Sequence, residues 1–120
     1  MFGLGELESA VMQELWDAAE PAKVRDVLGR LSSKKRLAYT TVMTVLDNLH
    51  RKGWVNRELV GKAYLYEPAL CREDAATRAL RDVLQASGNP ELTLLHFAKS
   101  ASDEETAILR DGLKRKSRRR

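Results

Sequence analysis

Residues 39–68 read YTTVMTVLDNLHRKGWVNRELVGKAYLYEP and carry the strongest structural signal in this 120-residue chain. In the first half of the stretch, apolar residues recur at every third or fourth position, which predicts a helix over 39–52. Those positions are Val42, Val45, Leu46 and Leu49. Gly53 follows, where a left-handed C-cap is common. The stretch therefore begins with a helix that ends at a glycine.

After Gly53 the apolar period changes to two, which is the period of a strand. Residues 54–59 and 62–67 are rich in aromatic and branched side chains, and Val60-Gly61 lies between them. Two such runs around a glycine predict an antiparallel hairpin. Pro68 follows the second run, as is typical of a strand end.

Two further helices are predicted before this stretch. Apolar residues recur at helical spacing from Leu4 to Trp16, Pro21 ends that helix, and a second helix is predicted over 24–31. The order of three helices and a hairpin is that of a winged helix-turn-helix. In this architecture the third helix enters the major groove of DNA and the hairpin lies along the backbone.

The chain after Pro68 returns to helical patterns. Residues 72–85 and 91–99 are helical in spacing, and Ser102-Asp103-Glu104-Glu105 matches a capping box that would start a last helix. The predicted fold class is therefore mainly α with a small β-hairpin. Its parts are a winged helix-turn-helix DNA-binding domain over residues 1–68, a helical dimerisation region over 69–113 and a basic, disordered tail over 114–120.

Charge is distributed unevenly along the chain. The formal net charge is +4, yet residues 114–120 alone carry six positive charges and no acid. Within the body, residues 30–62 have a net charge of +6, whereas 1–29 and 63–113 each have −4. A basic block in an acidic body indicates binding to nucleic acid.

The polar face of the helix predicted at 39–52 has side chains suited to reading DNA bases. A threonine hydroxyl can donate or accept a hydrogen bond, its methyl can contact thymine, and asparagine can pair with adenine. The residues predicted to face base edges are Tyr39, Thr40, Thr41, Thr44 and Asn48. Those predicted to hold phosphates are Arg51, Arg57 and Lys62, together with the loop Lys34-Lys35-Arg36. Asp47 is predicted to pair with Arg51 at i,i+4.

A solvated helix face and ordinary surface charge on the hairpin remain alternatives to these DNA contacts. Solvated helix faces usually carry glutamate and lysine, whereas this one carries three threonines, an asparagine and a methionine. That composition favours contact with DNA.

The apolar residues of the last three helices need a partner surface. About forty residues in short helices cannot readily close a core alone, so they cover either the first domain or a second copy of themselves. The first domain has its own apolar set, which favours a homodimer. The residues predicted to form its interface are Leu80, Val83, Leu84, Leu94, Leu95, Phe97 and Ile108.

Several functional classes are excluded by what the chain lacks. Cys71, His50 and His96 have no metal-site spacing, and neither a G-x-S-x-G elbow nor an HExxH motif occurs. We therefore expect no metal, no cofactor and no enzymatic activity.

No run approaches the roughly 18 apolar residues of a membrane span, and Glu6 and Glu8 interrupt any signal peptide. A cytoplasmic protein without membrane insertion is expected.

Several motifs of this chain resemble the penicillinase repressor (BlaI/MecI) family over about residues 4–113. They are Leu7-Glu8, Val11-Met12, Leu15-Trp16, the run LAYTTVMTVL at 37–46, Lys52-Gly53, and GKAYLYEP at 61–68. The run at 37–46 is the most specific of them, because other winged helices share the fold but not this string.

The resemblance implies a homodimeric repressor on an inverted-repeat operator, typically upstream of β-lactamase or related genes. In that family a membrane-bound sensor protease detects β-lactam, and the repressor is then cut at an Asn-Phe bond in its dimerisation region. The matching positions here are His96 and Phe97, with His in place of the family's Asn.

The sequence as a whole thus predicts a winged-helix transcriptional repressor that binds double-stranded operator DNA as a homodimer. The alternative is a winged-helix protein-interaction module without specific DNA binding.

Overall fold

The computed structural model describes residues 3–32 and 36–118, and the chain divides into two compact units, Met1–Ala79 and Leu80–Arg120. The first unit holds helices α1 (Glu6–Asp17), α2 (Val24–Ser32) and α3 (Tyr39–Arg51), strands β1 (Val55–Val60) and β2 (Ala63–Pro68), and the start of α4 (Arg72–Ala86). The second holds the rest of α4, α5 (Pro90–Ser100) and α6 (Asp103–Arg118). The predicted order of three helices and a hairpin is confirmed.

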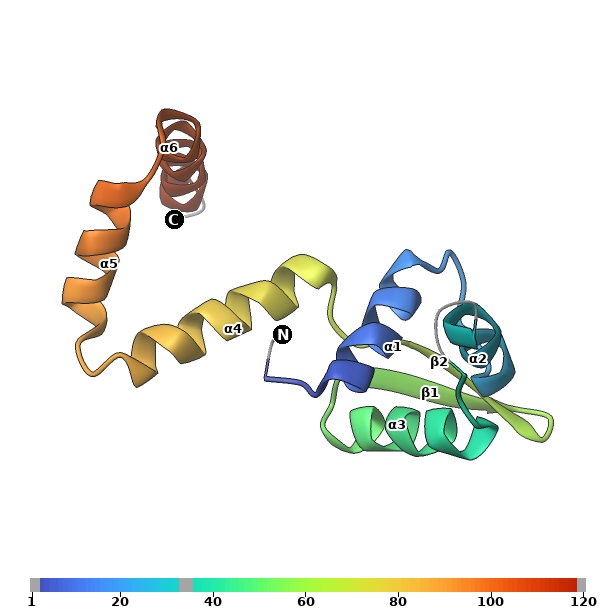
Figure 1. Cartoon of the computed structure of the whole chain (residues 1–120). Coiled ribbons are helices and arrows are strands. Elements are labelled where there is room, and N and C mark those ends of the chain that lie inside the picture. The colour runs from blue at the N-terminus through green and yellow to red at the C-terminus, as the bar shows by residue number, and fades with distance from the viewer. Residues whose placement is uncertain (1–2, 33–35, 119–120) are drawn as a thin grey trace. The chain divides into compact units, whose positions relative to one another are not determined.

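One apolar core closes the first unit, where α1, α2 and α3 gather around the hairpin (Figure 1). Each of the three helices buries one stripe of side chains at helical spacing, and complete burial of such a side chain stabilises the fold by about 1.5–3 kcal/mol. The buried helical residues are Val11, Met12 and Leu15, then Val24, Val27 and Leu31, then Val42, Leu46 and Leu49. Since α3 buries only this stripe, its opposite face is left to solvent.

The hairpin turn lies one residue later than the sequence predicted. The register runs from Val55 opposite Pro68 to Val60 opposite Ala63, so the two turn residues are Gly61 and Lys62 instead of Val60 and Gly61. Gly61 has φ +65°, and the tight hairpin turns require a positive φ at this first position. This places Lys62 at the tip of the hairpin.

A third segment bonds to the free edge of β2. Ala22 N donates to Tyr66 O and Tyr66 N donates to Ala22 O, each at 2.8 Å. The residues just before α2 therefore extend the sheet by one bridge and hold the hairpin against the helices.

An ion pair joins the first turn of α1 to the residue after α3. Lys52 Nζ lies 2.8 Å from Glu8 Oε2, and the Glu8 side chain is only 15% exposed. The hydrogen bond from Lys52 lowers the pKa of Glu8 below its usual value of 4.5, and a backbone hydrogen bond from Gly5 adds to this effect. Glu8 is thus held as a carboxylate in the folded state.

We expect the stability of Glu8→Gln to depend on pH. A lowered folded-state pKa stabilises the protein above the unfolded pKa, and this contribution is lost as pH falls through the folded value. At pH 7 the variant should lose about 0.5–1 kcal/mol of unfolding free energy, because the pair is partly exposed. Urea denaturation at pH 7 and in the strongly acid range checks this, with Glu20→Gln as control. A difference that persists unchanged at acid pH would contradict the ion-pair assignment.

The start of α4 belongs to the first unit. Arg72 Nη2 lies 2.8 Å from Asp17 Oδ1, the Arg72 guanidinium lies 5.4 Å from the Trp16 ring centre, and Ala75 is fully buried. The compact unit accordingly extends through Ala79, past the boundary at residue 68 that the sequence suggested. The proline there marks the end of the hairpin and not the end of the packing.

The helices of the second unit begin where the sequence provides caps. The Asn89 side chain accepts from Leu92 N at 3.0 Å, with Pro90 in the first turn of α5. At α6 the predicted capping box is confirmed, since Glu105 N donates to Ser102 Oγ at 3.1 Å and Ser102 N donates to Glu105 Oε1 at 2.9 Å. Among residues 3–32 and 36–118, no helix is both long and apolar enough to cross a bilayer.

The basic segment at the C-terminus differs from its prediction. Disorder was expected over 114–120, but α6 continues through Arg118. Lysine and arginine are good helix formers, and their charges interact favourably with a helix C-terminus. Arg115 Nη2 also pairs with Asp111 Oδ2 at 2.9 Å, one turn earlier. Residues 119 and 120 lie outside the described part of the chain.

Candidate nucleic-acid interface

The solvent face of α3 brings together most of the residues predicted to meet base edges. Tyr39, Thr40, Thr41 and Thr44 are all exposed, whereas the opposite face of α3 is buried in the core. Asn48 is half-buried, and its side-chain oxygen accepts a hydrogen bond from Arg51. This face is short and polar, so another molecule can approach the helix closely.

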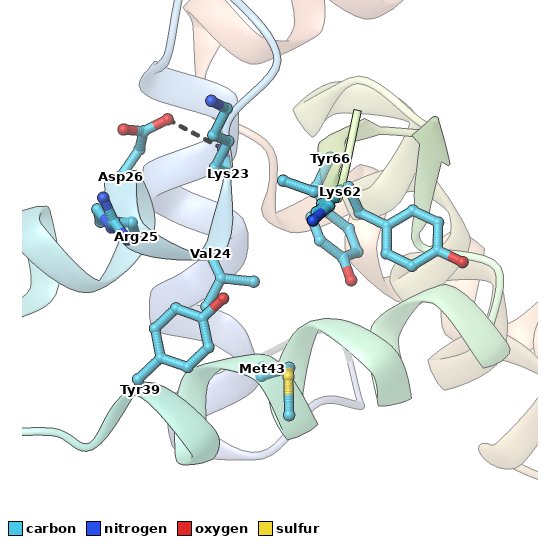
Figure 2. Close-up of a pocket in the computed structure, with 10 residues that line it drawn as sticks. Lys23, Val24, Arg25, Asp26, Tyr39, Met43, Lys62 and Tyr66 are labelled. Carbon is cyan, nitrogen blue, oxygen red and sulfur yellow. Dashed lines mark hydrogen bonds between the residues drawn. The ribbon is translucent and has the colours of Figure 1, made fainter. Parts of the chain in front are cut away.

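A groove of about 480 Å³ lies beside this face, between α3, the start of α2 and the hairpin. Figure 2 shows Tyr39 and Met43 rising from α3 on one side of the groove, with Lys23 near α2 and Lys62 and Tyr66 from the hairpin around the rest. Cationic and aromatic side chains thus surround one concave surface.

Two basic residues at this groove were missed by the sequence reasoning. Lys23 and Arg25 line the groove and are exposed, but they precede the basic block at 30–62. Asp26 also lines it, and its carboxylate accepts from Lys23 N at 3.0 Å, which caps the start of α2. The predicted fold could have identified Lys23 and Arg25 as groove residues, because in a helix-turn-helix the second helix begins beside the third.

A second hollow of about 360 Å³ continues the first along α3. It is lined by Met43, Thr44, Asp47, Arg57, Tyr64 and Tyr66, and three of these residues also line the larger groove. The predicted contact residue Thr44 therefore stands at the edge of a continuous groove between α3 and the hairpin.

Asp47 binds two arginines from different elements. Its Oδ2 lies 3.5 Å from Arg51 Nε, which confirms the predicted i,i+4 pair. Its Oδ1 lies 3.1 Å from Arg57 Nη1 on β1, a partner that the sequence did not indicate. The carboxylate consequently joins the outer part of α3 to the hairpin.

Arg57 is surrounded by groups of its own chain. Its guanidinium carbon lies 4.2 Å from the centre of the Tyr64 ring, a cation–π distance. A hydrogen bond to Tyr66 raises the pKa of Arg57 above its ordinary value, and the bond to Asp47 adds to this effect. The side chain thus stays charged and is directed towards α3 and the tyrosines.

The other predicted phosphate ligands are more open to solvent. Arg51 and Lys62 are exposed, at the end of α3 and the tip of the hairpin. Arg36 is exposed as well, whereas the predicted ligands Lys34 and Lys35 lie outside the described residues. Of these exposed cations, Lys62 lines the larger groove itself.

The second unit carries a different candidate surface. Six of the seven residues predicted for a dimer interface are exposed apolar side chains, and Leu84 is half-buried. The exposed ones are Leu80, Val83, Leu94, Leu95, Phe97 and Ile108. His96, next to Phe97 on α5, is exposed too. Within the described ranges, no three His, Cys, Asp or Glu side chains gather in a way that could hold a metal ion.

Comparison with known proteins agrees with this arrangement. The family model described as Penicillinase repressor matches residues 4–115, which is nearly the whole chain. The chain belongs to the penicillinase repressor family. The resemblance inferred from the motifs at 37–46 and 61–68 is confirmed.

Two curated relatives of this penicillinase repressor homologue come from Mycobacterium tuberculosis, strains CDC 1551 / Oshkosh and ATCC 25618 / H37Rv. Both are named Transcriptional regulator BlaI and are 39% identical over 113 residues, which cover 92% of this chain and 82% of theirs. Membership in this family of regulators confirms the prediction that the chain is not an enzyme.

Two solved structures share the fold of this family member. The solution structure of the DNA binding domain of the repressor BlaI matches with a TM-score of 0.54 and 25% identity, over 60% of this chain and 87% of that one. The Bacillus licheniformis BlaI monomeric form in complex with the blaP half-operator matches with a TM-score of 0.50 and 25% identity, over 59% and 85%. The winged-helix fold class is confirmed by both.

Proposed function

We propose that this protein is a sequence-specific DNA-binding transcriptional repressor that acts as a homodimer on an inverted-repeat operator. The observation that carries the proposal is the exposed threonine face of α3 beside a groove lined by cations from the start of α2 and from the hairpin. The relatives named as regulators, and the relative solved with a half-operator, support it.

In this proposal α3 enters the major groove of double-stranded DNA. Tyr39, Thr40, Thr41 and Thr44 face the base edges, where each good contact discriminates by about 1–3 kcal/mol. Asn48 joins them once its amide is released from Arg51. Short side chains serve this purpose because they let the helix backbone come close to the bases.

In this proposal four exposed cations of each protomer hold phosphates: Lys23, Arg25, Arg51 and Lys62. Each neutralised phosphate contributes about −0.9 to the slope of log K against log salt concentration. We therefore expect a slope near −7 for the dimer, by the same relation. Fluorescence anisotropy on a duplex selected from a randomised pool, measured across a salt series, gives this slope.

Two variants that each remove one positive charge, one at the proposed interface and one away from it, make the test more specific. Lys62→Gln should reduce the steepness of the slope by about 1.8 per dimer, whereas Lys99→Gln, on α5, should leave it unchanged. A slope near zero for the native protein would overturn the proposal. Capture of a protein partner without duplex binding would instead identify the interaction module that the sequence left open.

The homodimer part of the proposal rests on the exposed apolar side chains of the second unit. Soluble monomers rarely leave a large contiguous apolar patch uncovered, and a second copy is the partner always present at equal concentration. A two-fold dimer of DNA readers recognises two half-sites related by the same symmetry. An inverted repeat should accordingly emerge from the selection.

The proposal also includes regulation: the repressor controls β-lactam-response genes and is inactivated by proteolysis. The bond between His96 and Phe97 lies within α5, and cutting there would separate α6 from α4. The partner would be a sensor protease that acts on the repressor in the cytoplasm, where operator DNA is found. Loss of the dimer after cleavage would then release the operator.

A further inference from the structure

We propose that Arg57 is a positioning residue: its ion pair with Asp47 fixes the hairpin against α3, and it does not itself hold a phosphate. This inference rests on the proposed DNA-binding function. It reassigns a residue that the sequence placed among the phosphate ligands.

The two arginines on the Asp47 carboxylate differ in exposure. The Arg51 side chain is 68% exposed and belongs to the same helix as Asp47, whereas the Arg57 side chain is 24% exposed and comes from β1. The bond at 3.1 Å from Arg57 is also the shorter of the two. Arg51 can leave the carboxylate for a phosphate at little cost, but Arg57 cannot leave without uncoupling two elements.

The Arg57 guanidinium also stacks on a tyrosine ring of the other strand. The centre of the Tyr64 ring lies 4.2 Å from the guanidinium carbon, and Tyr66 is the partner of Arg57 across the hairpin. A planar guanidinium can stack and donate at the same time, which lysine cannot do. Moving Arg57 to a phosphate would break these contacts and leave the Asp47 carboxylate facing an anionic ligand.

The position of the Arg57–Asp47 pair along the hairpin explains how it can control the position of Lys62. At the base of the hairpin, Trp54 N donates to Leu49 O at 2.9 Å, and β2 is bonded to Ala22. Lys62 stands in the turn, beyond the end of β1 at Val60, which lies three residues or about 10 Å along the strand from Arg57. A small rotation of β1 at Arg57 therefore displaces Lys62 from the DNA backbone while α3 stays in the groove.

The test compares Arg57→Gln, Asp47→Asn and the double variant in the full-length chain. The readouts are affinity for the selected operator, affinity for a random duplex, and the salt slope on both. If the pair positions the hairpin, each variant should lower the operator-to-random ratio by about tenfold, and the double variant should be no worse than either single one. Each of the three variants should also reduce the steepness of the salt slope on the operator by about 1.8 per dimer, because the displaced Lys62 no longer holds its phosphate.

If Arg57 instead holds a phosphate, the results expected for Asp47→Asn are the opposite. Arg57→Gln would then reduce the steepness of the slope by about 1.8 per dimer, whereas Asp47→Asn would leave the slope at least as steep as that of the native protein. In the Arg51→Gln background, where Arg57 is the arginine that Asp47 still holds, Asp47→Asn would raise affinity for the operator, and this outcome would overturn the inference. Asp47→Asn decides the matter even if Arg57→Gln fails to fold. Native protein that binds no duplex at all would refute the proposed function and not this pair in particular.

Discussion

Val83→Asp is expected to yield monomers that bind an inverted-repeat operator 10²–10⁴-fold more weakly, in rough terms, than the native dimer. Val83 is 64% exposed on α4, in the second unit, so a charge there should not disturb the core of the first unit. Affinity falls because linking two half-site readers makes the second contact intramolecular, and separated monomers lose that advantage.

The matched control is Gln85→Asp, which adds the same charge at an exposed polar position of the same helix. Sedimentation velocity reports the assembly state, and anisotropy on whole and half operators reports binding. Binding to a half-operator should be equal for all three proteins. If Val83→Asp sediments as the native protein does, the apolar surface of the second unit is not the dimer interface.

Thr44→Ala is expected to weaken operator binding by about 1–3 kcal/mol per half-site, or roughly 5- to 150-fold, with little effect on a random duplex. Thr44 stands at the edge of the groove between α3 and the hairpin, on the exposed face of α3. Removing its hydroxyl and methyl deletes contacts to base edges but leaves the phosphate ligands in place.

Thr77→Ala on α4 is a suitable control, because Thr77 is exposed and bonds only to the backbone of its own helix, at Glu73 O. Competition titrations of labelled operator against unlabelled random duplex give the ratio directly. An equal loss on both duplexes would mean that Thr44 supports binding without reading sequence.

The elements that could be predicted from the sequence are those encoded by local patterns. The apolar spacing of Val42, Leu46 and Leu49 identifies α3 and its buried side, and hence also its exposed threonines. Capping at Ser102 and Glu105 identifies the start of α6 in the same way. Both patterns involve residues only a few positions apart, so they can be recognised without knowledge of the tertiary fold.

What the sequence could not predict depends on contacts between distant residues. Asp47 has Arg51 at a helical spacing, but its bond to Arg57 exists only because the hairpin folds back beside α3. Lys23 and Arg25 line the groove because α2 begins beside α3, and they were missed because they precede the basic block at 30–62. The predicted hairpin turn was wrong by one residue, because a glycine is common at both the first and the second position of such a turn. Only the strand register shows that Gly61 occupies the first position.

The bridge between Ala22 and Tyr66 bears on how the first unit folds. The hairpin is a local element that can form early, but the two bonds at 2.8 Å join it to a residue that precedes α2 and α3 in the chain. Such a long loop is closed only once the intervening helices have collapsed onto their core. We therefore expect the final placement of the hairpin to be a late step in folding, and its detachment to require cooperative opening of the unit instead of fraying at its tip.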